Sequence, residues 1–386
     1  YKRQEMVSLP KFISFWKMRA SFAEVGGPIN YTGLTPGTVT DPMKGGVINP
    51  ISVYPFPNFK AEQTKSYELG TNLRLFNNKI NIDATVYLTD TYNQTFLSSM
   101  SPASGYSGFY VQAGKVRNKG IELSLGYNDQ FGKVGYATNL TYTANRNKIM
   151  KMVHDYKNPS DGSLFSITEL TLQDKGGVYL REKDAIGDVY VKGILARGKD
   201  GKLIEEEGGY KVDRSQRIKI GSVNPDFSIG WRHNVTWNNI TLDLLFNGRF
   251  GGIVTSSTQA FLDDYGVSKD TYKARQNGGV WVNGTQYDAE KYYTTIGGEQ
   301  LMAYYAYKAT NIRLQEASLS YTLPGKWFGN VINRLTVSAI GRNLWMIYNK
   351  APFDPEMTSS TGTYNRGDVF MPPSLRSVGF SVKIEL

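Results

Sequence analysis

The 386-residue sequence contains no cysteine and only two histidines, His154 and His233. The lack of cysteine excludes disulfides, thiolate zinc sites, iron–sulfur clusters and cysteine nucleophiles, and two histidines leave little room for a histidine-rich metal centre. No segment approaches the ~18 consecutive apolar residues of a membrane-spanning helix. We therefore predict no metal or other cofactor and no helical membrane span.

The net charge is +10, from 44 Lys and Arg against 34 Asp and Glu, yet the basic residues form no block along the sequence. A basic balance fits nucleic acid or anionic lipid, but without a basic block we predict no nucleic-acid partner. The sequence begins at Tyr1 with residues that do not resemble a signal peptide. We therefore expect the chain to be a piece of a longer protein.

Alternation of apolar and polar residues dominates the sequence, and helical periodicity is almost absent. In residues 80–89, apolar positions from Ile80 to Leu88 alternate with polar ones from Asn81 onward. Ten stretches of this kind predict ten strands, nearly all close to the ~9–11 residues of a tilted membrane-spanning strand. The predicted strands are residues 12–22, 67–76, 80–89, 120–128, 134–143, 227–238, 240–249, 316–323, 335–342 and 377–386.

The connections between these strands alternate between short and long. The long connections are roughly residues 24–66, 90–119, 144–226, 250–315 and 343–376. Long loops without regular structure are uncommon in compact soluble domains. Outer-membrane β-barrels, in contrast, have short periplasmic turns at one end and long extracellular loops at the other. The pattern therefore predicts a transmembrane antiparallel β-barrel. If the C-terminus is periplasmic, the last strand runs inward, the first runs outward, and the alternation of short and long connections is consistent throughout.

Charged residues test this prediction, because Arg or Lys facing lipid at the bilayer midplane costs roughly 2–4 kcal/mol. Most charges in the predicted strands do fall on one face. Two residues do not follow this pattern. His233 falls on the face predicted to contact lipid, and Arg313 falls on the polar face only if a bulge or the water interface lies near Gln315. The residues that we predict to face the lumen, where they contact plug or water, are Arg74, Asp83, Glu122, Arg232, Asp243 and Arg249.

Aromatic residues cluster in the long connection at residues 250–315, where they could stack on sugar rings or contact a partner protein. Any one of these aromatic residues is explained more simply by ordinary packing within the loop. As a cluster, however, they predict a recognition surface. These candidate substrate- or lid-contacting residues are Tyr272, Trp281, Tyr287, Tyr292, Tyr293, Tyr304 and Tyr305.

Seven segments, in order, resemble motifs of the SusC/RagA family of TonB-dependent outer-membrane transporters. The first, Lys17 to Gly26, resembles the family's LRASYGxxGN strand, and Asn118 to Leu123 resembles its NKGxEL. The resemblance covers nearly the whole chain. The other five segments are residues 63–70, 224–230, 319–324, 341–345 and 353–356.

The resemblance implies that residues 1–386 form the C-terminal portion of a receptor barrel, supplying about ten strands of the 22 found in such transporters. The plug domain, TonB box and signal peptide would lie outside this chain. Implied partners are a SusD-like lipoprotein, the TonB complex, the remaining barrel and plug, and outer-membrane lipid or lipopolysaccharide. The implied function is import of oligosaccharides or peptides through the Gram-negative outer membrane, without catalysis. Asp354 to Glu356 would shape the last extracellular loop.

Two alternatives stay open at the level of sequence. The first is an outer-membrane enzyme on a closed ten-stranded barrel, which the even strand number permits. The second is a secreted carbohydrate-binding β protein, because sugar-binding domains are also rich in tyrosine and tryptophan. The enzyme requires catalytic groups in the barrel mouth, and the secreted protein would be soluble without detergent.

Overall fold

A single antiparallel sheet of ten strands organises the computed structural model, which describes residues 10–27, 39–41, 47–49, 53–54, 60–99, 101–157, 162, 164–172, 178–329, 331–359 and 367–385. All ten predicted strands are present, and each one pairs with its neighbours in chain order. Only Leu386 of the predicted strands lies outside the described residues. The strands are β1 (Ile13–Gly26), β5 (Gln63–Leu75), β6 (Ile80–Tyr92), β9 (Lys115–Phe131), β10 (Val134–Lys151), β19 (Phe227–Trp237), β20 (Ile240–Phe250), β25 (Asn311–Pro324), β26 (Arg334–Asn349) and β28 (Ser377–Glu385).

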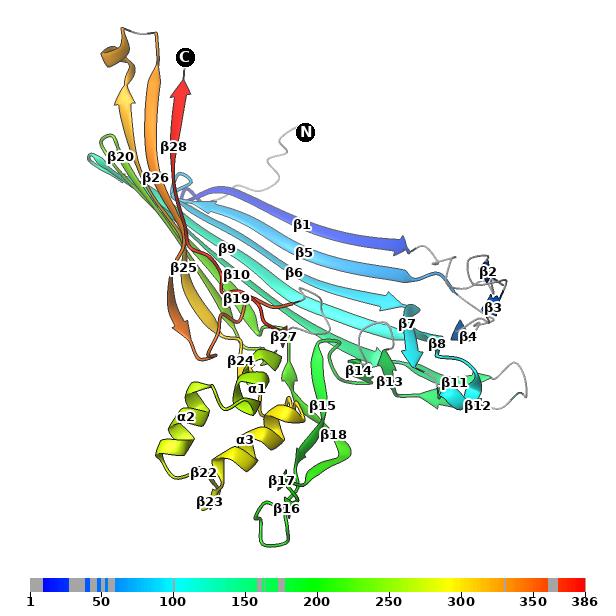
Figure 1. Cartoon of the computed structure of the whole chain (residues 1–386). Helices are drawn as coiled ribbons and strands as arrows, with labels where there is room; N and C mark the ends of the chain where they lie inside the picture. The colour runs from blue at the N-terminus through cyan, green and yellow to red at the C-terminus, as the bar shows by residue number, and fades with distance from the viewer. Residues whose placement is uncertain are drawn as a thin grey trace.

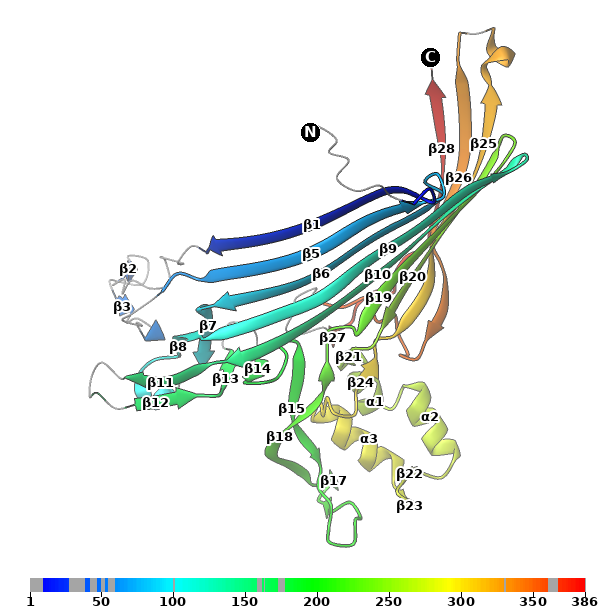
Figure 2. The same ribbon diagram turned by 180° about the vertical axis from the view of Figure 1, so that it is seen from behind.

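The sheet is strongly twisted and curved, with short turns along one end and long connections along the other (Figures 1 and 2). Tight turns join β5 to β6, β9 to β10 and β19 to β20, and the short helix η4 (Gly325–Phe328) lies between β25 and β26. The predicted alternation of short and long connections is therefore confirmed. Among the described residues, no helix is both long and apolar enough to cross a membrane.

The two outer strands of the sheet, β1 and β28, do not pair with one another within the described part of the chain. A closed ten-stranded barrel, which the first alternative required, is therefore not formed. Apolar side chains line both edges: Trp16 and Met18 are exposed on β1, and Val378 and Phe380 are each 83% exposed on β28. Such edges are templates for further strand pairing.

The pairing register accounts for one of the two residues that did not fit the sequence pattern. Between β20 and β25, Leu245 pairs with Glu316 and Phe246 with Leu314, so Gln315 is bulged out of the ladder. Because one extra residue reverses the alternation of faces, the bulge places Arg313 on the polar face, as the sequence required. His233 stays on the apolar face, where its Nδ1 lies 2.9 Å from the Tyr136 hydroxyl and its ring lies 4.3 Å from that of Trp231.

The first three long connections share a small sheet beside the outer ends of β9 and β10. It is held by a buried apolar cluster that includes Val116 and Ile149 from the large sheet and Phe96 and Leu180 from the connections. Its strands are β4 (Val53–Tyr54), β7 (Gln94–Ser99), β8 (Gly108–Ala113), β13 (Glu169–Leu172) and β14 (Val178–Arg181). Nearby minor elements are η3 (Pro102–Ser104), β2 (Val39–Asp41), β3 (Val47–Asn49), β11 (Val153–Lys157) and β12 (Leu164–Ile167).

Three helices in the fourth connection correct the near absence of helix expected from the sequence. They are α1 (Ser257–Asp264), α2 (Lys269–Gln276) and α3 (Ala289–Gly298). The side chains of Ser256, Ser268 and Asp288 cap their N-termini by accepting a backbone N–H bond. Helices of eight to ten residues are marginal alone, so capping and tertiary burial, rather than a long periodic pattern, specify them.

The helices pack against the third connection and form one body with it, the loop lobe (residues 188–222 and 251–310), which hangs below the sheet in Figure 1. The Tyr304 hydroxyl accepts a bond from the Leu195 amide at 3.0 Å, and Arg214 pairs with Glu299 at 2.6 Å. Within the third connection, Asp200 and Gly201 form a turn between Arg197 and Leu203, which pair as an antiparallel bridge, and Gly201 has φ +80°. The strands of the lobe are β15 (Asp188–Leu195), β16 (Glu205–Glu206), β17 (Gly209–Tyr210), β18 (Val212–Ser222), β21 (Ile253–Ser256), β22 (Val280–Val282), β23 (Thr285–Tyr287) and β24 (Ala306–Lys308).

The fifth connection, loop 5 (residues 350–376), also joins this body. Its strand β27 (Gly367–Asp368) pairs in parallel with β21. The Ser256 hydroxyl donates to Asp368 at 2.6 Å in a buried contact and also caps α1. Three long connections therefore form one continuous body at one end of the sheet.

Candidate functional site

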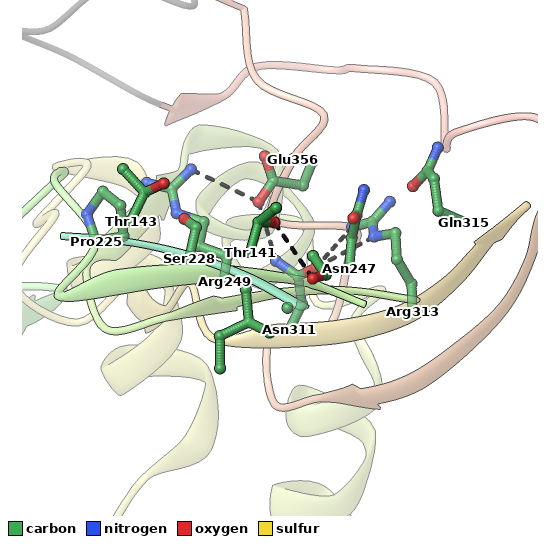
Figure 3. A pocket seen from close by; sticks show the side chains of 13 residues that line it. Thr141, Thr143, Pro225, Ser228, Asn247, Arg249, Asn311, Arg313, Gln315 and Glu356 are labelled. Atoms are coloured by element: carbon green, nitrogen blue, oxygen red, sulfur yellow. Dashed lines mark hydrogen bonds and ion pairs between the residues drawn. The ribbon is translucent and has the colours of Figure 1, made fainter. Parts of the chain in front are cut away.

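A polar cavity of about 710 Å³ lies on the sheet beneath loop 5; we call it the polar basin (Figure 3). Its floor is two adjacent rows of the ladder. One row runs from Thr141 through Gly230 and Asn247 to Arg313, and the next ends at Arg249 and Asn311. Its polar side chains are Thr141, Thr143, Ser228, Asn247, Arg249, Asn311, Arg313, Gln315 and Glu356.

The basin is fixed at one side by an ion pair between β25 and loop 5. Arg313 Nη2 lies 2.8 Å from Asp354 Oδ1, and Arg313 Nη1 lies 3.3 Å from Asp354 Oδ2. Asp354 also accepts a bond from the Ser374 hydroxyl. Burial disfavours the charged carboxylate, yet the bonds from Arg313 and Ser374 hold the pKa of Asp354 below its ordinary value. The pair therefore stays charged and holds loop 5 against the wall.

Glu356 closes the basin from above. Its Oε1 accepts a hydrogen bond from Asn311 Nδ2 at 3.0 Å and lies 3.6 Å from Arg249 Nη1. Arg249 Nη2 donates to the Val223 carbonyl at 2.6 Å. Arg249 thus connects β20 with both the end of the third connection and loop 5.

Several motif segments from the sequence converge on this basin. Pro225 and Gly230 belong to one segment and line it directly. A Cβ atom at Gly230 would lie 2.7 Å from Thr141 Oγ1, so glycine leaves the floor open at this point. Asn343, at φ +52°, belongs to another segment and donates to Ser374 Oγ at 2.7 Å. Motifs that are distant in sequence therefore build one wall.

The six residues predicted to face the lumen share one face of the sheet, the polar face, which is also the face of the basin. Asp83 accepts bonds from Arg19 at 2.6 Å and from Asn72 at 2.9 Å. Arg232 Nε lies 3.4 Å from Asp243 Oδ1. Only Arg249 lines the basin itself, whereas Arg74, Asp83, Glu122, Arg232 and Asp243 lie elsewhere on this face. Their contact with a plug remains a prediction.

The predicted aromatic residues divide into buried and exposed sets. Tyr287 and Tyr305 are 8% and 1% exposed within the core of the loop lobe, so they act in packing and not as surface contacts, which corrects the expectation for these two. Tyr292, Tyr293 and Tyr304 pack partly against the same core. Tyr272 and Trp281 are 58% and 62% exposed and remain candidates for contact with a substrate or partner.

The basin can bind a polar ligand through many directed contacts. It presents two guanidinium groups, one carboxylate, three amides and several hydroxyls, a set that matches peptide groups or sugar hydroxyls equally well. In the parts of the chain that the structure describes, no group of three or more His, Asp or Glu side chains is arranged to hold a metal ion.

Residues 7–244 match the family model described as TonB dependent receptor-like, beta-barrel. The chain belongs to this family. Two relatives from Formosa agariphila are similar to it: TonB-dependent receptor P3 is 25% identical over 373 residues, covering 89% of this chain, and TonB-dependent receptor P39 is 21% identical over 415 residues, covering 94%. The predicted resemblance to TonB-dependent transporters is thereby confirmed.

Solved structures with the same fold include the RagAB peptide transporter, with 18% identity, a TM-score of 0.71 and coverage of 98% of this chain. The closed-closed state of the RagAB peptide importer has a TM-score of 0.73. The chain spans 36% of the length of receptor P3 and 42% of the RagAB chain. The likeness confirms the predicted fold, a TonB-dependent receptor barrel of which this chain forms a part.

The sequence did not identify the basin residues Asn247, Asn311 and Glu356 as a set. Asn247 and Asn311 lie on adjacent strands but are 64 residues apart in sequence, and Glu356 comes from a loop. The charge of Arg313 was the sequence feature that pointed to the site. A buried arginine on a bulged strand needs a carboxylate partner, and Asp354 lies in the next long connection.

Proposed function

We propose that this chain is the C-terminal part of an outer-membrane importer that uses TonB-derived energy to take up oligosaccharides or peptides with a SusD-like surface lipoprotein. One observation carries the proposal: a ten-stranded sheet of membrane-length strands has long connections only at one end, in a chain of the TonB-dependent receptor family. The RagAB peptide transporter, which shares the fold, supports import with a partner.

The open outer edges of the ten-stranded sheet support the proposal that this chain forms only part of the barrel. Among the described residues, the outer edges of β1 and β28 have no partner strand, and both strands carry exposed apolar side chains. Further strands are therefore needed to satisfy the backbone groups of these two edges in lipid. We propose that the remaining strands and the plug come from the rest of the full-length protein, and that the polar face of this sheet lines the lumen around the plug.

The polar basin is the proposed substrate contact in this part of the barrel. It lies on the polar face directly beneath loop 5, and the loop lobe stands beside it. Exposed Tyr272 and Trp281 lie on the same lobe, where they would contact substrate or the lipoprotein. Polar groups in the basin and exposed aromatic side chains on the loop lobe are suited to sugar rings and to peptides alike.

Uptake by the full-length protein tests this proposal. A strain lacking the gene, complemented with the wild type, should take up a labelled oligosaccharide or oligopeptide, and uptake should stop when TonB is deleted. Asn247→Trp should fill the basin and reduce uptake without loss of outer-membrane assembly. Asn81→Trp, on the polar face but outside the basin, is the matched control. Uptake that continues unchanged without TonB, or a protein absent from the outer membrane, would contradict the proposal.

A further inference from the structure

Six basic side chains form a ladder on the face of the sheet opposite the polar basin. In the register of β9 and β10, Lys119 lies opposite Arg146, Arg117 opposite Lys148, and Lys115 opposite Lys151. Because side chains alternate between faces, five of them point the same way as Ile121 and Leu123 rather than Glu122. The sixth, Lys151, reaches this face through the register shift between Ile149 and Lys151. We call them the basic ladder.

The arrangement is electrostatically unfavourable for the chain alone, since like charges directly opposite each other on paired strands repel. Three acidic contacts relieve part of the repulsion. Asp90 lies 2.7 Å from both Lys115 and Arg117, and Asp226 lies 3.0 Å from Arg146. Among the described residues, no acidic side chain lies within ion-pair distance of Lys119, Lys148 or Lys151. The ladder therefore keeps an excess of positive charge that an external anion can balance.

The position of the ladder identifies the surroundings of that anion. On β10, the residues of this face from Val134 to Ala144 are all uncharged, a stretch of about the ~9–11 residues that cross a membrane in a tilted strand. Arg146 is the next residue on this face, toward the end that carries the long connections. The ladder thus begins where the uncharged membrane-facing surface ends, on the outer side.

The height of the ladder favours one kind of lipid. Its three rungs extend about 14 Å along the strands, or about 10 Å in height for a strand tilted by about 45°. A phospholipid headgroup layer is only about 5–8 Å thick on each side of a bilayer. Anionic groups distributed over a thicker, sugar-containing headgroup would reach all three rungs.

A cavity of about 450 Å³ lies beside the end of β10 that leads into the third long connection, and it borders the ladder at Arg146 and Lys148. Three carboxylates also line it: Asp184 and Asp188 are paired with Lys219, and Asp226 is paired with Arg146. Space for a phosphate group is therefore present next to Lys148, which has no acidic partner among the residues that the structure describes.

We propose that the basic ladder binds the phosphate groups of a multiply phosphorylated glycolipid in the outer leaflet. The proposal rests on the outer-membrane location given under Proposed function. It gives part of the net charge of +10 a specific role, although the sequence contains no continuous block of basic residues. Lys119, Lys148 and Lys151 supply positive charge that no carboxylate of the described residues neutralises.

The test uses the full-length protein purified from outer membranes in detergent. Wild type is compared with the triple variant Lys119→Gln, Lys148→Gln, Lys151→Gln, which breaks no ion pair of the described residues. The charge-matched control is Lys199→Gln, Lys202→Gln, Lys269→Gln, three exposed lysines on the loop lobe. Binding is measured by thermal shift and native mass spectrometry with bisphosphorylated lipid A, monophosphorylated lipid A and inorganic phosphate.

Wild type and control should bind bisphosphorylated lipid A with equal affinity, more tightly than the monophosphorylated form, and more weakly as NaCl is raised. The triple variant should bind at least roughly tenfold more weakly, about 1.4 kcal/mol. Equal binding by the triple variant and the control would overturn the proposal, and so would an equal thermal shift with inorganic phosphate at matched phosphate concentration.

If the triple variant fails to assemble, Lys119→Gln alone should still weaken lipid binding about threefold relative to Lys199→Gln. These measurements are independent of transport. If uptake is normal and TonB-dependent but the triple variant keeps full lipid affinity, only the proposed lipid binding by the ladder is contradicted. If the protein binds the lipid but shows no uptake, only the proposed import function is contradicted.

Discussion

The guanidinium of Arg313 and the carboxylate of Asp354 form a two-point ion pair across 41 residues of sequence, and each side chain is only 8% exposed. This pair depends on two irregularities of the sheet. The bulge at Gln315 turns Arg313 toward the polar face, and the break in pairing at Asn343 brings that amide to Ser374, which in turn bonds to Asp354.

Loss of one partner should release loop 5 from the wall. Arg313→Met leaves Asp354 buried without its cation, and removing one member of a buried pair costs about 3–5 kcal/mol. We expect amide exchange in residues 350–359 to become faster by a corresponding amount, measured by hydrogen-exchange mass spectrometry of the full-length protein. The double variant Arg313→Met, Asp354→Leu should recover part of the loss, because neither charge remains.

Arg342→Gln is the matched control for that prediction. Arg342 Nε pairs with Glu316 at 2.9 Å but is 65% exposed, and exposed pairs contribute about 0.2–1 kcal/mol. The rate of amide exchange in loop 5 should hardly change in Arg342→Gln. An effect as large as that of Arg313→Met would show that burial does not determine the strength of these pairs.

The loop lobe should depend more on a buried tyrosine hydroxyl than on its exposed ion pair. Tyr287 Oη accepts a hydrogen bond from the buried Leu203 amide at 3.0 Å. Tyr287→Phe leaves that amide without an acceptor, which costs about 1–3 kcal/mol. Amide exchange in residues 195–212 should be faster in this variant. Arg214→Gln, which removes the half-exposed pair with Glu299, should change exchange much less, and the reverse order would refute the argument.

The contact between Glu182 and His154 should weaken in acid. Burial disfavours the Glu182 carboxylate, but bonds from His154, the Met152 amide and Lys183 lower the pKa of Glu182 to about 2, from an ordinary value of 4.5. A lowered folded-state pKa gives stability that is complete above about pH 4.5 and is lost as the pH falls toward 2. The protection factor of the Met152 amide should follow this course.

Glu182→Gln separates that effect from general acid unfolding. The variant should have a lower Met152 protection factor at neutral pH and should lose the Glu182-dependent part of the decline below pH 4.5. Glu206→Gln, on the exposed strand β16 of the loop lobe, should behave like the wild type. Identical pH profiles for wild type and Glu182→Gln would contradict the prediction.

The strands were predictable because their information is local. Residues 80–89 alternate between apolar and polar side chains, and the strand β6 (Ile80–Tyr92) forms there with the expected faces. Lipid on one side and water or protein on the other impose the same period of two on every strand. Charge placement added the expectation of an irregularity near Gln315, which the register confirms.

The helices and the basin were not predictable in this way. Helix α1 is only eight residues long, and it is stabilised by a cap at Ser256 and by burial against residues of another connection. Burial of Tyr287 and Tyr305 depends on that same packing. The sequence shows these residues as loop aromatics, because the partners that cover them lie far away in the chain.

The sequence by itself determined the ten strands, their two faces and the end at which the long connections lie, because each follows from the alternation of neighbouring residues. Only the tertiary structure decided which charges meet. Arg313 reaches Asp354, and Lys119 is placed opposite Arg146, through pairing registers that join segments far apart in the chain. The basic residues that look scattered in the sequence gather into a ladder for this reason.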